Sequence, residues 1–237
     1  LLAKGMGIAP LTCVATAAVR DAEDGPEFQA LVERETGLHL HVIDGAEEAR
    51  LSAQGVLLGW PEADGLICDI GGNSMELAEV RRGRVWRRVT SQLGPFRLQQ
   101  VPGGRKELIS HIKEVVTDLA AQMGTDYERI YLVGGSWRAI ARLDMERRAY
   151  PLLVLHEYRM EPEGLIKTLD WIEKNELADL RARTGISNAR MELVPLASLV
   201  LRELIESFTP KEIDISSYGI REGLLYEQMP ERLRRRD

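Results

Sequence analysis

The chain has 237 residues, of which 44% are hydrophobic and 29% are charged, which excludes a disordered or fibrous protein. Its formal net charge of −6 excludes binding of nucleic acid through bulk positive charge, so any polyanion must be held locally. No apolar run approaches the ~20 residues that cross a bilayer, and no secretory pattern opens the chain. Its two cysteines, Cys13 and Cys68, fall in apolar runs that we expect to be buried strands. We therefore expect a cytoplasmic protein without membrane contact.

The first quarter of the chain predicts two units in which a short strand precedes a helix. Asp24 and the proline that follows the next glycine are typical of a helix start, and Gly37 is typical of a helix end. Glu47 and Glu48 mark the first turn of the second helix, which ends at Gly59. The expected elements are strands over residues 11–16 and 38–43 and helices that begin near residues 24 and 45.

The rest of the chain mixes strands and helices without an internal repeat, which predicts a mixed α/β architecture. Apolar side chains follow the helical period closely from Leu108 to Met123, so this segment is expected to be a core helix. The other expected elements are strands over 66–70, 75–80, 85–90, 130–133 and 212–216, helices over 137–143, 165–172 and 191–208, and a terminal helix.

The strongest local feature is a glycine turn at residues 69–76 (DIGGNSME), where Asp69 ends a buried strand. Glycines at 71 and 72 allow backbone N–H groups to converge on a phosphate, and Asp69 could hold Mg²⁺, which prefers oxygen ligands. An ordinary tight hairpin explains the same pattern equally well. Glu76 adds modest support, because strand alternation puts this acid at the head of an apolar row where a metal would compensate its charge.

Three further features each allow a structural and a functional reading. Glu47 and Glu48 suit a helix N-terminus on dipole grounds, although a carboxylate there could also take a proton from an attacking water. Residues 134–136 (GGS) form a second glycine turn that is either an anion site or a plain chain reversal. Two basic clusters, at 81–88 and 232–236, are explained most simply as a solvated hairpin and a helix end. Zinc and serine-hydrolase patterns are absent from the sequence.

Taken together, five segments resemble motifs of the exopolyphosphatase and guanosine pentaphosphate phosphohydrolase (Ppx/GppA) family. They match in order and approximate spacing over nearly the whole chain, which is more specific than any single match. The segments are 15–20 (ATAAVR), 44–50 (DGAEEAR), 69–77 (DIGGNSMEL), 133–138 (VGGSWR) and 218–225 (YGIREGLL). The resemblance implies an α/β actin-like (ribonuclease H-like) two-lobed ATPase fold with the active site between the lobes.

By position, the resemblance implies a role for each site residue. Glu48 matches the general base, while Asp69 and Glu76 match acids that hold Mg²⁺ or another divalent ion. Phosphate-binding positions are implied by the resemblance or suggested by the two glycine turns. They are Gly71, Gly72, Asn73, Ser74, Arg20, Gly134, Gly135 and Ser136. The implied reaction is attack of water on the terminal phosphate of polyphosphate or of guanosine pentaphosphate. We also expect a bacterial protein that forms a homodimer and binds no nucleic acid.

The resemblance also implies a division of the chain and two departures from the family pattern. We expect residues 1–64 to be the remainder of lobe I with a linker, 65–218 to be lobe II, and 219–237 to be a terminal helix that returns to lobe I. The family's first phosphate loop would precede Leu1, so the N-terminal lobe is expected to be incomplete. Asn73 replaces a third glycine and Met75 is also unusual, but Asn tolerates left-handed backbone, so the turn should persist.

Two other functions stay open at this point. A sensing module that binds polyphosphate or a nucleotide without turnover would fit Asn73, Met75 and the expected absence of the first loop. A kinase of the same fold would instead transfer phosphate to an acceptor hydroxyl. Because one fold hosts many activities, the fold alone does not decide among these.

Overall fold

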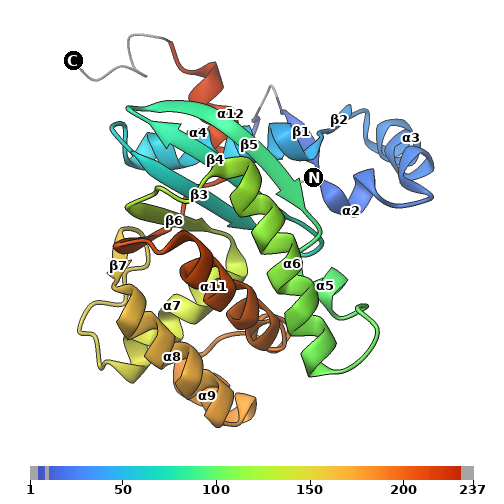
Figure 1. The fold of residues 1–237 in the computed structure, drawn as a ribbon. Helices are drawn as coiled ribbons and strands as arrows, with labels where there is room; N and C mark the ends of the chain where they lie inside the picture. Colours follow the sequence, from blue (N-terminus) through green and yellow to red (C-terminus); the bar gives the residue numbers. More distant parts are fainter. Residues whose placement is uncertain (1–4, 9–10, 231–237) are drawn as a thin grey trace.

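The computed structural model describes residues 5–8 and 11–230 (Figure 1). Its centre is a six-stranded sheet with the order β5-β4-β3-β6-β8-β7, in which β3, β6 and β8 are parallel. A separate parallel pair, β1-β2, lies near the N-terminus. The strands are β1 Cys13–Ala15, β2 Leu40–Val42, β3 Gly65–Ile70, β4 Met75–Arg81, β5 Arg84–Ser91, β6 Arg129–Val133, β7 Tyr158–Met160 and β8 Glu212–Ser216. The predicted mixed α/β class is therefore confirmed.

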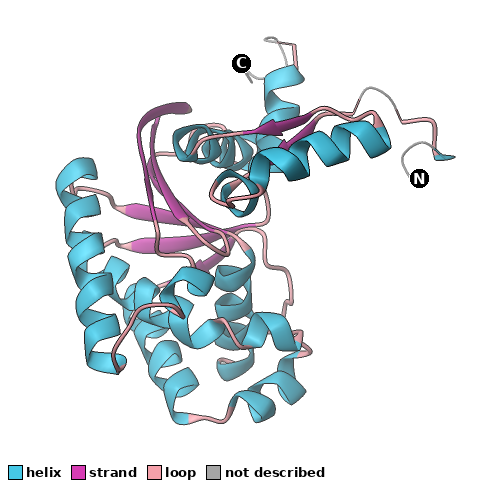
Figure 2. Ribbon diagram, turned by 90° about the vertical axis from the view of Figure 1, so that its right-hand side faces the viewer, coloured by secondary structure: helices cyan, strands magenta, loops and turns pink. Residues whose placement is uncertain are grey.

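Helices cover both faces of the six-stranded sheet, as Figures 1 and 2 show. One face packs against α4, with Ile67, Ala78 and Tyr131 in the shared core. The other face packs against α6, α7, α8 and α11. The helices are α2 Ala17–Arg20, α3 Gly25–Thr36, α4 Gly45–Gly59, α5 Pro95–Leu98, α6 Arg105–Met123, α7 Gly135–Arg147, α8 Pro162–Lys174, α9 Leu177–Thr184, α10 Asn188–Met191, α11 Val194–Phe208 and α12 Ile220–Gln228.

The burial of β3 explains both its composition and its place in the middle of the sheet. Every residue of this strand is buried, because Ile67 faces the core with α4 while Leu66 and Cys68 face the core on the opposite side. A strand covered on both faces is expected to be a continuous apolar run. Asp69 interrupts that run at its carboxyl end, where β3 pairs with β4 on one side and β6 on the other.

Helices α4 and α12 pack so closely that their backbones touch. A Cβ added at Gly223 of α12 would lie 1.9 Å from the Leu51 carbonyl oxygen of α4, and one added at Gly55 would lie 2.1 Å from the Gly219 carbonyl oxygen. Only glycine permits such an approach. Helix α4 is therefore held in place by the six-stranded sheet on one side and by α12 on the other. The division of the chain into lobes at residues 64 and 218 stays a prediction.

Several boundaries differ from the sequence-based expectations. The helix expected over 191–208 is interrupted, and α11 begins only at Val194 with Pro195 in its first turn, because proline lacks the N–H that would continue a preceding helix. Cys13 is half-buried rather than buried. The short elements β7 and α9 were not predicted at all. The basic cluster at 232–236 lies outside the described residues. No helix in the described part of the chain has the length and apolar character needed to span a membrane.

The contact between α4 and α12 predicts a large effect of a single methyl group. We expect Gly223→Ala to destabilise the fold by roughly 1–3 kcal/mol, because the added Cβ meets backbone that cannot move aside. Gly164→Ala in α8 is the control, since nothing lies within 4 Å of the added Cβ and alanine favours the helix. Urea unfolding of both variants measures the difference. Equal unfolding midpoints would contradict the close packing.

Candidate active site

The glycine turn that joins β3 to β4 brings two acids side by side. Asp69 and Glu76 are directly opposite each other in the antiparallel ladder, so their side chains leave the sheet on the same face. The Gly71 N–H donates to the Ser74 carbonyl oxygen over 2.9 Å and closes the turn. The predicted hairpin is thereby confirmed, and it places the two acids at its base.

Gly72 of this turn is needed for space, whereas a Cβ at Gly71 would make only an ordinary contact, 3.5 Å from the Ser74 carbonyl oxygen. The turn persists, as expected, and neither glycine nor Asn73 is among the residues with positive φ. A Cβ at Gly72 would lie 2.7 Å from the Phe96 ring, and the Phe96 N–H donates to the Gly72 carbonyl oxygen over 2.8 Å. The start of α5 therefore supports the turn from outside.

Glu48 joins these acids from the first turn of α4. Asp44 caps the helix by accepting a hydrogen bond of 2.7 Å from the Glu47 N–H, which fixes where the next residue points. The Glu48 side chain is buried, whereas Glu47 pairs with Arg50 on the outer face of the helix. Burial raises the pKa of Glu48, and the negative charge of Asp69 raises it further. The structure thus separates the two glutamates, which helix-dipole arguments alone did not distinguish, and it buries the one that the resemblance selected.

Glu76 is the most strongly perturbed acid of the group. Burial, followed by the negative charge of Glu48, raises the pKa of Glu76 to about 8. Thr90 donates to Oε1 of Glu76 over 2.9 Å, but Oε2 is buried and has no hydrogen-bond partner within the described part of the chain. Burial also raises the pKa of Asp69, although Ser52 donates to this carboxylate. Three acids are therefore crowded together without enough positive charge to neutralise them all.

This donor set fits a hydrated Mg²⁺ ion better than a metal enclosed by protein ligands. Within residues 5–8 and 11–230, no group of three or more Asp, Glu, His or Cys side chains is arranged to hold a metal ion. Mg²⁺ is usually bound through one or two carboxylates and keeps water or substrate phosphates as its other ligands. The unpartnered oxygen of Glu76 and the neighbouring Asp69 carboxylate supply that smaller set.

The second glycine turn lies directly beside the first. A Cβ at Gly134, where φ is +118°, would lie 2.4 Å from the Ile70 carbonyl oxygen and 3.3 Å from Asp69 Oδ1. Gly135 then begins α7, and the Ser136 side chain is buried. The two turns therefore meet because β3 and β6 are parallel neighbours whose carboxyl ends coincide. The structure brings Gly134, Gly135 and Ser136 to the same place as the acids.

The Arg20 side chain reaches the acids but is already hydrogen-bonded to two groups. Its Nη1 donates to Glu48 Oε2 over 3.2 Å and to the Ile43 carbonyl oxygen over 3.0 Å. Arg20 thus contacts Glu48 directly, in addition to the phosphate-binding position expected for it. Such a pair orients the carboxylate and partly offsets its burial.

Three arginines that the sequence analysis did not select lie near one another beside Asp69 and the second glycine turn. Burial lowers the pKa of Arg138, and the positive charges of Arg190 and Arg221 lower it further, while Asp69 opposes this. Among the residues the structure describes, no acid forms an ion pair with any of the three, whereas most buried acids elsewhere are paired. Arg138 and Arg221 lie in segments that carried the resemblance, but no local pattern marked Arg190. Unpaired arginines that converge on one point are typical of an anion site.

A cleft of about 570 Å³ opens beside these groups. It is lined by Asp69, Gly134 and Arg138 from the sheet and α7, by Arg221 from α12, and by Thr16 near β1. The site is therefore built from segments that are far apart in sequence. Glycine turns, buried carboxylates and free guanidinium groups together are typical of enzymes that act on phosphate esters or anhydrides.

The chain belongs to the Ppx/GppA phosphatase family, whose model matches residues 1–232. The predicted class, a hydrolase of the exopolyphosphatase type, and the predicted family are thereby confirmed.

Curated relatives and solved structures agree with this assignment. The chain is 26% identical over 242 residues to exopolyphosphatase 1 of Mycobacterium bovis, covering 96% of this chain and 70% of that protein. It resembles the structure of an exopolyphosphatase from Cytophaga hutchinsonii with a TM-score of 0.84, at 20% identity over 96% of this chain and 77% of that one. The Aquifex aeolicus Ppx/GppA phosphatase matches with a TM-score of 0.75, at 20% identity over 97% and 78% of the two chains. These structural matches confirm the actin-like fold.

The raised pKa of Glu76 predicts that metal-free protein loses stability as the pH rises. The unfolded chain ionises near the ordinary value of 4.5, while the folded chain keeps its proton until about 8. In chelator, stability should therefore fall by up to roughly 4 kcal/mol across this window and then level off. Glu76→Gln should remove most of this fall. Urea unfolding between pH 5 and pH 9 measures it.

Glu79→Gln is the matched control on the same strand. The Arg87 guanidinium holds the pKa of Glu79 below its usual range, so this acid stabilises the fold above its unfolded pKa and loses that contribution as the pH falls. The Glu79 variant should therefore lose stability where the Glu76 variant gains it. A pH profile that Glu76→Gln leaves unchanged would contradict the burial of an uncompensated acid.

Proposed function

We propose that this protein is an exopolyphosphatase that releases the terminal phosphate of inorganic polyphosphate by Mg²⁺-assisted attack of water. The observation that carries the proposal is the convergence of Glu48, Asp69 and Glu76 with two glycine turns, beside a cleft that Asp69, Gly134, Arg138 and Arg221 line. Family membership and relatives named exopolyphosphatases support it. The roles that the arginines and the acids would have at a terminal phosphate support it further.

The terminal phosphate would be received by the positive side of the cleft. Arg138, Arg190 and Arg221 would neutralise phosphate oxygens, because no acid among the described residues forms an ion pair with them and the charges of Arg190 and Arg221 act against that of Arg138. The glycine turns at 71–74 and 134–136 would add backbone N–H donors. Together they would fix the phosphorus opposite the acids, so that positioning supplies much of the catalysis.

Glu48 would act as the general base. The water oxygen attacks the terminal phosphorus, the bond from this phosphorus to the bridging oxygen breaks, and the shortened polyphosphate leaves with that oxygen. The proton of the attacking water passes to a carboxylate oxygen of Glu48. A pKa raised by burial suits this role, since a base is most effective when its pKa lies near the operating pH. Arg20 would orient the carboxylate.

Asp69 and Glu76 would hold Mg²⁺ or another divalent ion. The ion would neutralise charge on the substrate phosphates and replace the proton that Glu76 otherwise keeps.

Guanosine pentaphosphate is the second substrate that we propose for the same cleft. Its 5′ end carries the same terminal phosphoanhydride, so the residues above would act on it without any change of role. We further propose that the chain forms the two lobes given by the boundaries at 64 and 218, with α12 returning to lobe I. The contact of α12 with α4 supports this division. A homodimer and a cytoplasmic location remain predictions from the sequence.

The assignment of the base predicts that Glu48→Gln lowers the rate of phosphate release from polyphosphate by about 100-fold or more. Glu47→Gln is the matched control, because this neighbouring acid faces away and pairs with Arg50. It should keep a near-normal kcat. The measurement is phosphate release by the full-length enzyme with Mg²⁺. Equal rates for wild type and Glu48→Gln would exclude Glu48 as the base.

The arginine cluster predicts an effect on substrate binding. Arg138→Ala should raise KM for polyphosphate by about 10-fold and reduce the dependence of KM on salt, since one phosphate contact is lost. Arg142→Ala on the same helix is the control, because this exposed residue does not line the cleft. Steady-state kinetics at several salt concentrations measure KM and its dependence on salt for both variants. Equal effects of the two variants would rule out a specific role for Arg138.

A further inference from the structure

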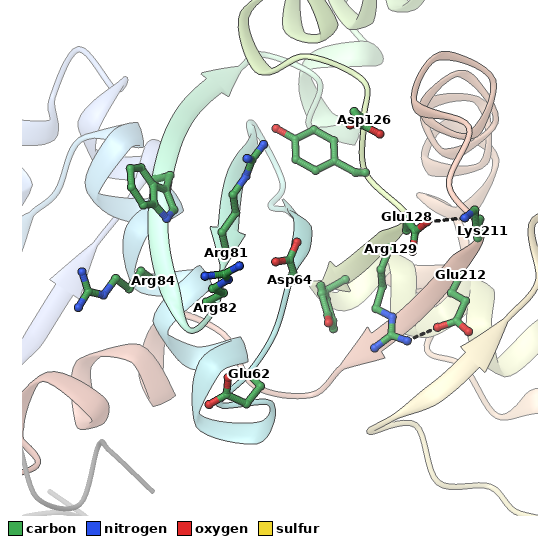
Figure 3. A pocket seen from close by; sticks show the side chains of 13 residues that line it. Glu62, Asp64, Arg81, Arg82, Arg84, Asp126, Glu128, Arg129, Lys211 and Glu212 are labelled. Carbon is green, nitrogen blue, oxygen red and sulfur yellow. Dashed lines mark hydrogen bonds and ion pairs between the residues drawn. The ribbon is translucent and has the colours of Figure 1, made fainter. Parts of the chain in front are cut away.

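A cavity larger than the cleft of the candidate active site lies at the opposite end of the sheet. This amino-end cavity, of about 1180 Å³, opens where β3, β6 and β8 begin and where the β4–β5 hairpin turns (Figure 3). Asp64, just before β3, lines it, whereas Asp69 at the far end of the same strand belongs to the candidate active site. The two sites are therefore about 17 Å apart along β3, at the ~3.3 Å rise of one strand residue.

Part of the charge that lines the amino-end cavity is already compensated. Arg129 pairs with Glu212 and Asp214, and Lys211 pairs with Glu128. These pairs come from β6, β8 and the loops before them, and form one wall of the cavity in Figure 3. A ligand gains little from such groups, because it would have to break existing pairs.

Other charged groups of the same cavity have no such partner. Among the residues the structure describes, no ion pair involves Arg82 or Arg84 of the β4–β5 hairpin. The same holds for Glu62 and Asp64, which lie in the segment that contacts the hairpin tip, and for Asp126 in the loop before β6. Free cations and free carboxylates therefore line one concavity.

The backbone at the hairpin tip holds Arg82 in an unfavourable conformation. Arg82 has a φ of +49° and Gly83 has a φ of +72°, the pattern of a tight hairpin turn in which Asn-Gly is favoured. An arginine at the first of these positions costs about 1 kcal/mol relative to a residue that suits it. The tip is also fixed, since a Cβ at Gly83 would lie 2.5 Å from the Pro61 carbonyl oxygen. The guanidinium therefore projects from a rigid tip.

Trp86 supplies a flat apolar surface two residues after Arg84, on the same face of β5. Its side chain is 59% exposed, although a tryptophan ring normally gains most from burial. It lines the cavity at the irregularity of the β4–β5 ladder between Ala78 and Val80. An exposed indole next to a guanidinium can stack on a planar ring.

The combination of free arginines, free carboxylates and an exposed indole does not suit a ligand with only one kind of chemical group. A polyanion would meet the free carboxylates, a polycation would meet the free arginines, and an apolar molecule would leave both sets unpaired. We propose that the amino-end cavity binds a nucleoside phosphate. The base stacks on Trp86, the phosphate pairs with Arg82 and Arg84, and the Asp64 and Glu62 carboxylates accept hydrogen bonds from sugar hydroxyl or base amino groups.

The test uses adenosine and guanosine 5′-monophosphate, because these probes have no phosphoanhydride bond for the candidate active site to cleave. Calorimetric titration of the full chain should show that at least one of them binds at submillimolar concentration. Arg82→Asn should weaken binding by about 10-fold, and so should Trp86→Leu. Because Asn suits the turn at position 82, this variant should be at least as stable as the wild type.

Two controls separate this site from the candidate active site. Glu48→Gln should bind the monophosphates as the wild type does, and inorganic phosphate should bind far more weakly than either nucleotide. The proposal is overturned if neither nucleotide binds at millimolar concentration, or if Arg82→Asn and Trp86→Leu bind like the wild type. It is also overturned if Arg138→Ala abolishes binding while the two hairpin variants do not.

Discussion

The arrangement of this molecule depends on holding three carboxylates together in a place that water hardly reaches. Glu48, Asp69 and Glu76 repel one another, and burial makes each charge more costly. Folding tolerates this only because several donors are brought to the same point. Arg20 contacts the first acid, Ser52 the second and Thr90 the third. The negative charge that these donors leave uncompensated is what a bound divalent ion would neutralise.

The close packing of glycines makes this convergence possible. Gly223 and Gly55 let α12 and α4 touch, which fixes the helix that carries Glu48. Gly134 lets the second turn approach the carboxyl end of β3 to within contact of Asp69. In each case a methyl group would separate the two segments. The site is accordingly a property of packing between layers and not of any one loop.

The sequence was sufficient for the features that depend on local pattern. Periodicity predicted the core helix that became α6 and the strand that became β8, and ordered motifs identified the family and the acids of the site. What could not be predicted depends on distance in space. Nothing local distinguished Glu48 from Glu47 until the Asp44 cap set the direction of the helix. Arg190 was missed because an exposed arginine in a short helix has no pattern of its own.

The central claim is that Glu76 keeps a proton until a divalent ion takes its place. This claim is tested most directly by titrating the protein with Mg²⁺ at pH 7 in buffers of different ionisation enthalpy, which measures the protons released on binding. With a pKa of about 8, Glu76 should release close to one proton per Mg²⁺, and Glu76→Gln should release none. Binding of Mg²⁺ to the wild type without proton release would contradict the account.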